Sequence, residues 1–361
     1  MNKLLSLALA SATLLSLLCS CGGTVTPKED PGPMVEFIDD AGRTVFVPEN
    51  ITRVAVTGPL AQIVVFSLAP DKLVATASEW SNDAQQYLDE TYYDLPVLGQ
   101  LYGGSSNMNI EELAKVDPQI VIDVGETKVG LAKEMDSIEA RTSIPVVHIH
   151  AELLSMDTTY ETLGRLLDME EEATVLGKYC ADTYTRSLNI MEQVGDHKIS
   201  ALYCMGDLGC NVICLDSYHS AVLDLLTENL AIVDNPTSKG TGNEVNLEQI
   251  CLWNPDVVFF APNSIYDFVK EEPGWAELTA IKTDRYYEVP YGIYNWMGFP
   301  PSVQRYLGMV WMSKILYPEY ATYDLYEEVQ TFYHLFFHCD ITPEQYEVLT
   351  EKSIGKMEAA S

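Results

Sequence analysis

Basic residues are scarce in this sequence, and their scarcity excludes several functions. The 361 residues include 21 Lys and Arg against 53 Asp and Glu, which gives a formal charge of −32 at pH 7. Binding to nucleic acid or to anionic lipid needs clustered Lys and Arg, so neither partner is expected. Because 47% of the residues are hydrophobic and 20% are charged, the chain can bury a sizeable core. Its length suggests about two domains.

A long apolar run occurs only at the N-terminus, from Leu4 to Leu18. Fifteen residues are too few for a comfortable membrane span and are typical of a signal-peptide core. The segment Leu18-Cys19-Ser20-Cys21 resembles a bacterial lipoprotein signal, with a small residue directly before the lipidated Cys. We therefore expect a signal peptide over 1–20, lipidation of Cys21 and a tether over 21–34. The alternative, a buried N-terminal helix with two core thiols, fits poorly with the Pro- and Gly-rich stretch that follows.

Six cysteines remain beyond the expected anchor, and their spacing does not define a metal site. The three that lie close together contain no C-x-x-C pair and have no His at finger spacing, which disfavours zinc. An exported protein can form disulfides, but six cysteines allow fifteen pairings. Small buried thiols and one local disulfide both remain open for the three close together, Cys204, Cys210 and Cys214. The sequence does not choose a pairing among Cys180, Cys204, Cys210, Cys214, Cys251 and Cys339.

Alternating strand and helix patterns predict an α/β fold with two lobes. Short apolar segments at 54–56, 72–75 and 120–122 are separated by helical patterns, as in a parallel sheet. The region 155–194 instead predicts almost continuous helix, with Gly164 and Gly177 as weak breaks, before the alternation resumes. The expected units are an N-terminal lobe over 35–154, a helical linker over 155–197 and a C-terminal lobe over 198–361, with a hairpin over 35–47 and helices over 303–316 and 325–337.

An internal repeat supports two related lobes. In residues 109–122 and 246–259 an Asn precedes a two-turn helix, a Glu follows two positions later, and a Pro leads into an apolar strand. The Asn can cap the helix, and Glu111 and Glu248 suit the positive end of the helix dipole. Capping alone could explain these residue types, but it does not explain one such unit in each lobe.

Taken together, these features resemble the substrate-binding lipoproteins of ABC importers for iron-siderophores, haem and cobalamin. The resemblance rests on the lipoprotein signal, the segment from Phe37 to Pro48, the paired Asn-x-Glu helices, and the long helical region between α/β lobes. It implies two Rossmann-like lobes joined by one long rigid helix, with the ligand in the cleft between them. It also implies that Glu111 and Glu248 dock onto Arg residues of a permease dimer.

The same resemblance implies a transport role rather than catalysis. The protein would be a monomer, lipid-anchored on the extracytoplasmic side of a bacterial membrane, in the periplasm or at the cell surface. It would have no intrinsic cofactor, would carry an iron chelate (a ferric siderophore or haem) or a corrinoid, and would work with a permease dimer and its ATPase. An exported enzyme, adhesin or sensor on the same scaffold is the alternative, but G-x-S-x-G, H-E-x-x-H and Walker motifs are absent from the sequence.

Ligand contacts are expected in the loops that follow the strands, at the cleft between the lobes. The loop over 291–297 is rich in aromatic residues, which would suit a planar macrocycle or a catecholate, although packing within the lobe is the alternative. Lys128, Lys239, Arg285 and Arg305 lie near these loops without a motif, and the scarcity of basic residues mildly favours a neutral or weakly charged ligand. No metal ligand is assigned. The expected ligand contacts are Pro59, Trp80, Tyr102, Thr127, Met205, Asn263, Tyr291, Tyr294 and Trp296.

Overall fold

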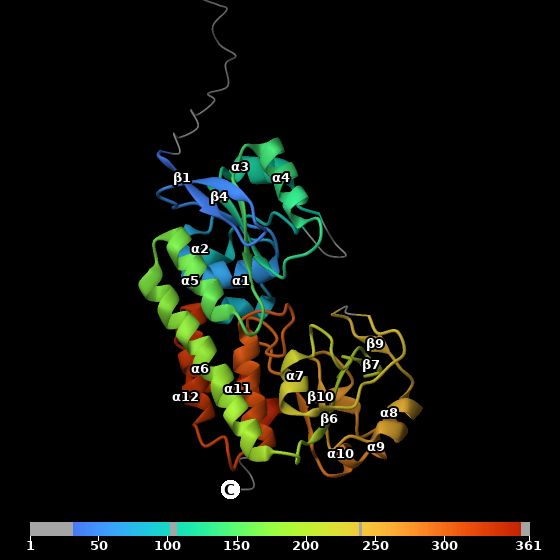
Figure 1. Cartoon of the computed structure of the whole chain (residues 1–361). Coiled ribbons are helices and arrows are strands. Elements are labelled where there is room, and N and C mark those ends of the chain that lie inside the picture. Colours follow the sequence, from blue (N-terminus) through green and yellow to red (C-terminus); the bar gives the residue numbers. More distant parts are fainter. Residues whose placement is uncertain (1–31, 102–106, 238–239, 355–361) are drawn as a thin grey trace, which may run out of the picture.

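The computed structural model describes residues 32–101, 107–237 and 240–354. They form two α/β lobes and a layer of long helices that runs along both of them (Figure 1). The expected signal peptide, Cys21, Tyr102 and Lys239 lie outside the described residues. No helix within the described ranges combines the length and the apolarity that a membrane span needs.

The N-terminal lobe is built on a parallel sheet of three strands in the order β3-β4-β5. These strands are buried almost throughout, as expected for parallel strands that are covered on both faces. An antiparallel hairpin of β1 and β2 precedes the sheet, which confirms the predicted hairpin. The strands are β1 (Met34–Ile38), β2 (Thr44–Pro48), β3 (Val54–Val56), β4 (Ile120–Gly125) and β5 (Val146–His150), and the helices are α1 (Pro59–Leu68), α2 (Glu90–Tyr93), α3 (Ile110–Val116) and α4 (Leu131–Thr142), with 3₁₀ turns at Pro70–Lys72 and Asn82–Gln86.

The C-terminal lobe contains a mixed sheet of six strands. Strands β6, β8, β10 and β11 run parallel, whereas β7 and β9 extend the sheet in the antiparallel sense. The strands are β6 (Ser200–Met205), β7 (Asn211–Val212), β8 (Glu228–Asn229), β9 (Asn243–Glu244), β10 (Val257–Phe260) and β11 (Tyr286–Glu288), and the helices are α7 (Ala221–Leu226), α8 (Leu247–Trp253), α9 (Pro273–Ala276), α10 (Thr279–Lys282) and α13 (Pro343–Ile354), with a 3₁₀ turn at Tyr266–Phe268.

The helical linker consists of two packed helices, α5 (Met156–Leu167) and α6 (Glu170–Val194), rather than one continuous helix. The chain turns between them at Asp168, which has a left-handed φ of 55°. Gly164 lies at the closest approach, because a Cβ built there would lie 2.6 Å from the Cβ of Ala173. This glycine therefore permits close helix packing and does not break the helix. With a rise of 1.5 Å per residue, α6 is a rod about 37 Å long that joins the lobes.

Two helices of the C-terminal segment return to the linker and to the N-terminal lobe. Helix α11 (Gln304–Leu316) packs against α6, and α12 (Leu325–Phe337) packs against both α11 and α1 (Figure 1). Directly after α12, Nε2 of His338 lies 3.2 Å from the carbonyl oxygen of Phe66. The segment expected to belong to the C-terminal lobe therefore also contacts the N-terminal lobe.

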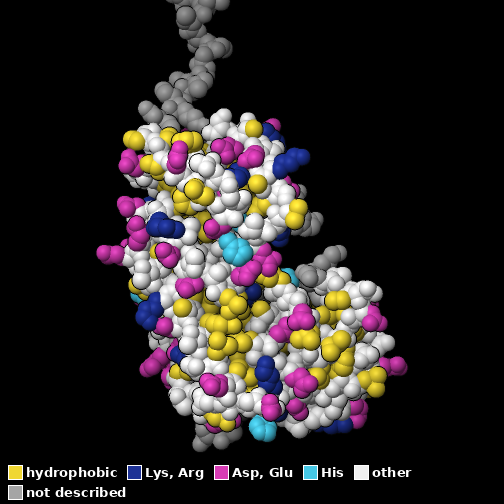
Figure 2. Space-filling model, in the orientation of Figure 1, with side chains coloured by type: hydrophobic (Ala, Val, Ile, Leu, Met, Phe, Trp, Pro, Cys, Tyr) yellow, Lys and Arg dark blue, Asp and Glu magenta, His cyan; other side chains and the backbone are white. Residues whose placement is uncertain are grey.

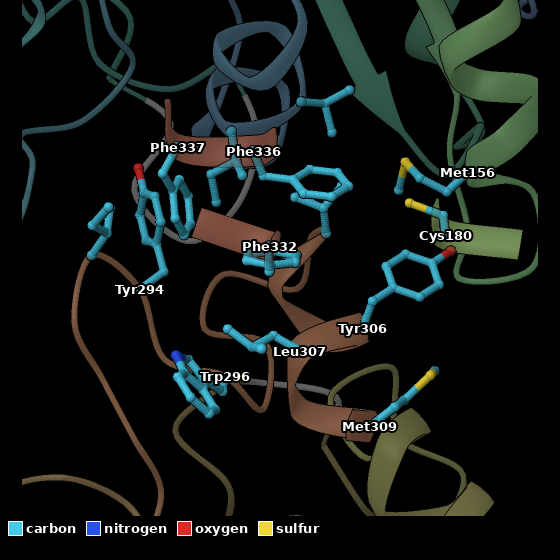
Figure 3. Packing of buried hydrophobic residues seen from close by; sticks show 14 of the residues in the cluster. Met156, Cys180, Tyr294, Trp296, Tyr306, Leu307, Met309, Phe332, Phe336 and Phe337 are labelled. Carbon is cyan, nitrogen blue, oxygen red and sulfur yellow. The ribbon is translucent and has the colours of Figure 1, made fainter. Parts of the chain in front are cut away.

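A single hydrophobic cluster extends through both lobes and the helical layer. In Figure 3, Phe332, Phe336 and Phe337 of α12 lie between Tyr294 of the C-terminal lobe and Met156 of α5. The rings of Phe332 and Phe336 are stacked with centroids 4.5 Å apart. The lobes are joined by the helix α6 and not by a strand hinge. Because they also share this core, any closing motion has to strain packed helices.

Candidate functional site

A cleft of 780 Å³ lies between the lobes. Its N-terminal wall is formed by residues 57–61, where β3 leads into α1, and by residues 123–126 and Lys128, where β4 ends. Its C-terminal wall includes Tyr218, His219 and Pro301. Figure 2 shows the surface indented between the two lobes. The cleft lies at the carboxyl ends of parallel strands, where α/β folds bind ligands.

The start of helix α1 presents free hydrogen-bond donors to the cleft. Gly58 occupies the cap position without a side-chain hydrogen bond, and Pro59 follows at the first helical position, where its missing N–H costs nothing. The backbone N–H groups of Leu60 and Ala61 donate to no acceptor among the described residues. The first turn contains no acidic residue. This helix end therefore offers two N–H groups and a partial positive charge to an anion.

Two further groups give the cleft a capacity for anions. Lys128 lines it and forms no ion pair within the described ranges. His219 faces it from the other lobe, stacked on Phe299 with ring centroids 4.9 Å apart and with Nδ1 3.4 Å from the carbonyl oxygen of Gly298. Burial lowers the pKa of His219, so its ring is neutral at pH 7. Because Nδ1–H donates to the carbonyl oxygen of Gly298, Nε2 accepts a hydrogen bond in the neutral ring and donates one only after the ring gains a proton. Glu126 lies on the same lining and opposes ligands of high negative charge.

Asp123 stabilises the loops of the N-terminal wall. It is buried, accepts a hydrogen bond from the hydroxyl of Thr57, and lies 2.6 Å from Nδ1 of His148. The other ring nitrogen of His148 lies 3.0 Å from Oγ1 of Thr127, which is also 3.3 Å from Nδ1 of His150. Thr127, one of the expected ligand contacts, is therefore bonded to two histidines and does not line the cleft.

Three aromatic residues expected to contact the ligand lie in the hydrophobic core instead. Trp80, Tyr294 and Trp296 are between 1% and 7% exposed. The indole of Trp80 donates to the carbonyl oxygen of Tyr92 and packs on Phe66 at 5.0 Å between ring centroids. Figure 3 shows Tyr294 and Trp296 among the core side chains. Since packing explains these residues, we do not assign them to the ligand.

The other expected contacts are divided among different places. Pro59 is the one described candidate that lines the cleft. Met205 ends β6 and packs against the core. Asn263 and Tyr291 line a separate polar pocket of 500 Å³ beside Lys352. Tyr218 and His219 were not among the expected contacts, and Arg305 was noted only for its charge. No periodicity or motif marks these residues. A turn brings Tyr218 and His219 to the cleft, and the first turn of α11 brings Arg305 to a neighbouring pocket that shares Tyr218 with the cleft.

The repeated Asn-x-Glu units form matching helices on the outside of the two lobes. Asn109 caps α3 by accepting from the N–H groups of Glu111 and Glu112, and Asn246 caps α8 by accepting from that of Gln249. Glu111 and Glu248 are exposed in the first turn of their helices. Capping accounts for the asparagines, and it leaves both glutamate carboxylates available to a partner.

The six cysteines of the described chain are all unpaired thiols. Cys180, Cys204 and Cys214 are buried, and burial raises the pKa of each thiol. Buried thiols, one of the two options left open by the sequence, therefore account for Cys204 and Cys214. Within residues 32–101, 107–237 and 240–354, no cluster of three or more His, Cys, Asp or Glu side chains is arranged to hold a metal ion.

Comparison with known proteins defines the class. The family model described as "Periplasmic binding protein" matches residues 54–291, more than half of the chain, and the chain belongs to this family. Its members are extracytoplasmic solute-binding proteins that work with an ABC permease and an ATPase and are not enzymes. The protein is therefore a solute-binding protein of an ABC importer, and the alternative of an exported enzyme is set aside.

Three relatives illustrate the similarity. An ABC transporter solute-binding protein of Sulfurospirillum deleyianum has a TM-score of 0.79 and 26% identity, covering 88% of this chain and 99% of its own. The molybdate-binding protein MolA of Haemophilus influenzae is 24% identical over 85% of this chain and 92% of its own, and its structure has a TM-score of 0.63. The catecholate-siderophore binding protein VctP of Vibrio cholerae has a TM-score of 0.53 and 18% identity, covering 71% of this chain and 91% of its own.

Proposed function

We propose that the cleft captures a small solute that presents anionic oxygens, either a bare oxyanion or a metal chelate, and delivers it to the permease. The observation that carries this proposal is the start of α1, whose Leu60 and Ala61 N–H groups are unpaired among the described residues and border the cleft. Lys128 adds a cation, and His219, on the other side, adds a donor when its ring is protonated. The cleft volume of 780 Å³ is in the range of small-molecule sites.

The aromatic loop over 291–297 suggested haem or a corrinoid as the ligand, but this cleft is poorly suited to either. A planar macrocycle needs flat apolar walls. Among the described residues that line the cleft, the aromatic side chains are Tyr218 and His219, which are too few to form such walls. The expectation of a neutral ligand, which rested on overall composition, is replaced by one of an anionic ligand. Molybdate, named for MolA, and a ferric catecholate, of the class named for VctP, both present anionic oxygens. An iron chelate therefore remains within the proposal.

We also propose that Glu111 and Glu248 dock onto basic residues of the permease. The support is that two exposed carboxylates occupy equivalent positions on helices α3 and α8, one on each lobe. A pair on separate lobes can report the relative position of the lobes. Exposed ion pairs contribute modest affinity but good orientation and association rate. The proposed lipid anchor at Cys21 would hold the protein near that permease despite its negative charge.

A titration panel tests the ligand class. Purified protein is mixed with molybdate, a ferric catecholate complex, haem and cyanocobalamin, and binding is measured by calorimetry and by the shift in melting temperature. We expect saturable 1:1 binding of at least one of the two anionic probes, with weaker or no binding of haem and cyanocobalamin. Binding of haem or cyanocobalamin alone would show that the ligand class is wrong while the transport class stands.

A further inference from the structure

The hairpin of β1 and β2 has an outer face that is apolar and exposed. Side chains alternate along a strand, so Met34 and Ile38 of β1 lie on the same face. Phe46 of β2 is in register with Glu36, midway between them, and therefore lies on that face as well. Met34, Ile38 and Phe46 are 42%, 73% and 55% exposed. We call these three residues the hairpin patch.

The hairpin patch is a group of apolar side chains and not a set of scattered ones. Single exposed apolar residues are normal on a protein surface, whereas a group rimmed by polar residues marks a site of interaction. Met34 and Phe46 also line a groove of 590 Å³ between β2 and the end of α4. Figure 2 shows hydrophobic side chains gathered at this end of the N-terminal lobe, with acidic side chains among them.

The turn of the hairpin is fixed to the sheet, so the hairpin patch has a defined orientation on the lobe. Asp39 is buried, pairs with Arg43 at 2.7 Å and accepts from the backbone N–H of His148 at 3.2 Å. Asp40 donates its backbone N–H to the carbonyl oxygen of His148 at 3.0 Å and accepts from the N–H of His150 at 2.7 Å. These contacts with β5 hold the inner face of the hairpin on the core and leave the outer face to a partner.

The position of the hairpin patch in the chain indicates which partner it meets. Met34 follows the expected lipidated Cys21 by 34 − 21 = 13 residues. A flexible tether of this length has an end-to-end distance of about 20 Å and reaches about 45 Å at most. In Figure 1, β1 lies at the end of the N-terminal lobe that is remote from the C-terminal lobe. The hairpin patch is therefore held near the bilayer, whereas exposed apolar residues of the C-terminal lobe are attached through α6.

Charge selects the kind of lipid surface. Glu36 lies within the outer face, and Asp136 and Glu139 border the groove beside it. Together with the net charge of −32 they repel anionic headgroups, but they do not repel a zwitterionic surface. Because a short tether raises the local concentration into the millimolar range, a contact of three apolar side chains is enough to keep the hairpin on the bilayer.

We infer that the hairpin patch inserts into the interface of a zwitterionic lipid bilayer and orients the N-terminal lobe on the membrane. This inference rests on the proposed lipid anchor at Cys21 and adds to it a direct contact of the folded chain with lipid. Residues 34–48 do not line the cleft, so the protein can lie on the bilayer with its cleft open to the solute.

The test uses the full chain, expressed in a host that lipidates it and reconstituted into phosphatidylcholine vesicles with or without bromine on the acyl chains. Phe46→Trp places a fluorescent reporter in the hairpin patch and keeps the patch apolar. Bromine quenches an indole only at close range, and an inserted apolar face reaches the boundary of headgroups and acyl chains. We expect brominated vesicles to remove about half of the emission that Phe46→Trp adds to that of the wild type.

Matched variants separate the hairpin patch from exposed apolar residues in general. Phe268→Trp is the control reporter, because Phe268 is 62% exposed on the C-terminal lobe, and bromine should not quench it. Ile38→Ser, added to Phe46→Trp, should lower the quenching about twofold or more because it removes apolar area from the contact. Ile232→Ser, at a position that is 70% exposed on the C-terminal lobe, should leave the quenching unchanged. If Phe46→Trp does not fold, Ile38→Trp provides the same reporter.

Mass spectrometry of Cys21 separates a failure of the anchor from a failure of the inference. With lipid on Cys21, an unquenched Phe46→Trp, or equal quenching of Phe268→Trp, would overturn the inference and leave the transport function standing. Stronger quenching on vesicles that contain phosphatidylglycerol would also overturn it, because the contact would then depend on charge. A blue shift that needs no vesicles and grows with protein concentration would place a second copy on the patch instead. If Cys21 carries no lipid, the proposed anchor fails and this inference fails with it.

Discussion

The side-chain amide of Gln62 donates a hydrogen bond of 3.2 Å to the hydroxyl of Tyr294, which lies 232 residues further along the chain. Gln62 belongs to α1 of the N-terminal lobe, and its Oε1 accepts from the backbone N–H groups of Ala77 and Ser78. Both side chains are buried, so this polar contact links the lobes within the shared core. It assigns Tyr294 to the interface between the lobes and not to the ligand.

Tyr294→Phe should therefore destabilise the fold and leave ligand affinity unchanged. The substitution removes the hydroxyl and leaves the amide of Gln62 buried without that partner, at a cost of about 1–3 kcal/mol in the free energy of unfolding. Urea denaturation measures the first effect and calorimetric titration the second. Tyr291→Phe, at a half-exposed position of the same loop, is the matched control and should cost little. A loss of affinity without a loss of stability in Tyr294→Phe would return Tyr294 to the ligand site.

The contact between α5 and α6 at Gly164 predicts a second stability effect. Gly164→Ala would place a methyl group 2.6 Å from the Cβ of Ala173, so the two helices have to separate. Overpacking of this kind costs about 1–3 kcal/mol, although alanine is the better helix former. Thr174→Ala, at an exposed position of α6, is the control. An increase in the free energy of unfolding for Gly164→Ala would contradict the close packing.

Binding of an anion should strengthen as the pH falls below about 6.5. Burial lowers the pKa of His219, so the ligand-free ring stays neutral while an exposed histidine gains a proton. An anion in the cleft favours the charged ring, so protons and ligand should bind cooperatively. Titration of the better probe between pH 7.5 and 5.5 measures this effect, and His219→Gln should reduce the pH dependence.

The same histidine predicts the opposite trend for the stability of the ligand-free protein. Its pKa is lowered in the folded state, so the unfolded chain binds more protons below pH 6.5. The contribution of His219 to the free energy of unfolding is therefore fully present above the pKa that this histidine has in the unfolded chain. It is lost as the pH falls through the lower pKa of the folded state. Urea melts over the same range should show a shallower slope for His219→Gln. Equal slopes for the variant and the wild type would contradict a neutral buried ring.

The proposed docking role of Glu111 and Glu248 predicts a transport defect without a binding defect. Reversing both charges to Lys should abolish uptake in cells that express the cognate permease, because two attractive contacts become repulsive. Calorimetric affinity for the ligand should not change, since both residues lie outside the cleft lining. Glu161→Lys with Glu192→Lys, at exposed positions of α5 and α6, reverses the same charge elsewhere. Normal uptake by the Glu111 and Glu248 variant would show that these residues do not dock.

The architecture could be predicted from the sequence because the order of strands and helices depends on local patterns. Apolar segments before and after helical periodicity identified β3, β4 and β10, and the repeated Asn-x-Glu-to-Pro unit located α3 and α8. The predicted boundaries of strands and helices were less accurate where tertiary packing overrides the local sequence pattern. The expected strand at 72–75 forms only a single bridge between Leu73 and Val54, because a 3₁₀ turn begins at Pro70.

The ligand contacts were less predictable because they depend on contacts between distant segments. Tyr294 and Trp296 look like loop aromatics in the sequence, and contacts with distant residues bury them, Phe337 of α12 for Tyr294 and Trp311 of α11 for Trp296. By contrast, Pro59 lines the cleft, and its place at a helix start could be predicted because a Gly-Pro pair shortly after a strand marks one by local geometry alone.

The start of α1 is proposed to bind an anionic solute, and titration of the Leu60→Asp variant is a direct test of this binding. Leu60 lines the cleft in the first turn, where a carboxylate suits the helix dipole but repels an incoming anion. Leu188→Asp, at an exposed position of α6, is the control. We predict 1:1 binding of molybdate or the ferric catecholate to the wild type and the control, and loss of that binding in Leu60→Asp. Undiminished binding by a folded Leu60→Asp protein would show that the start of α1 does not bind the anion.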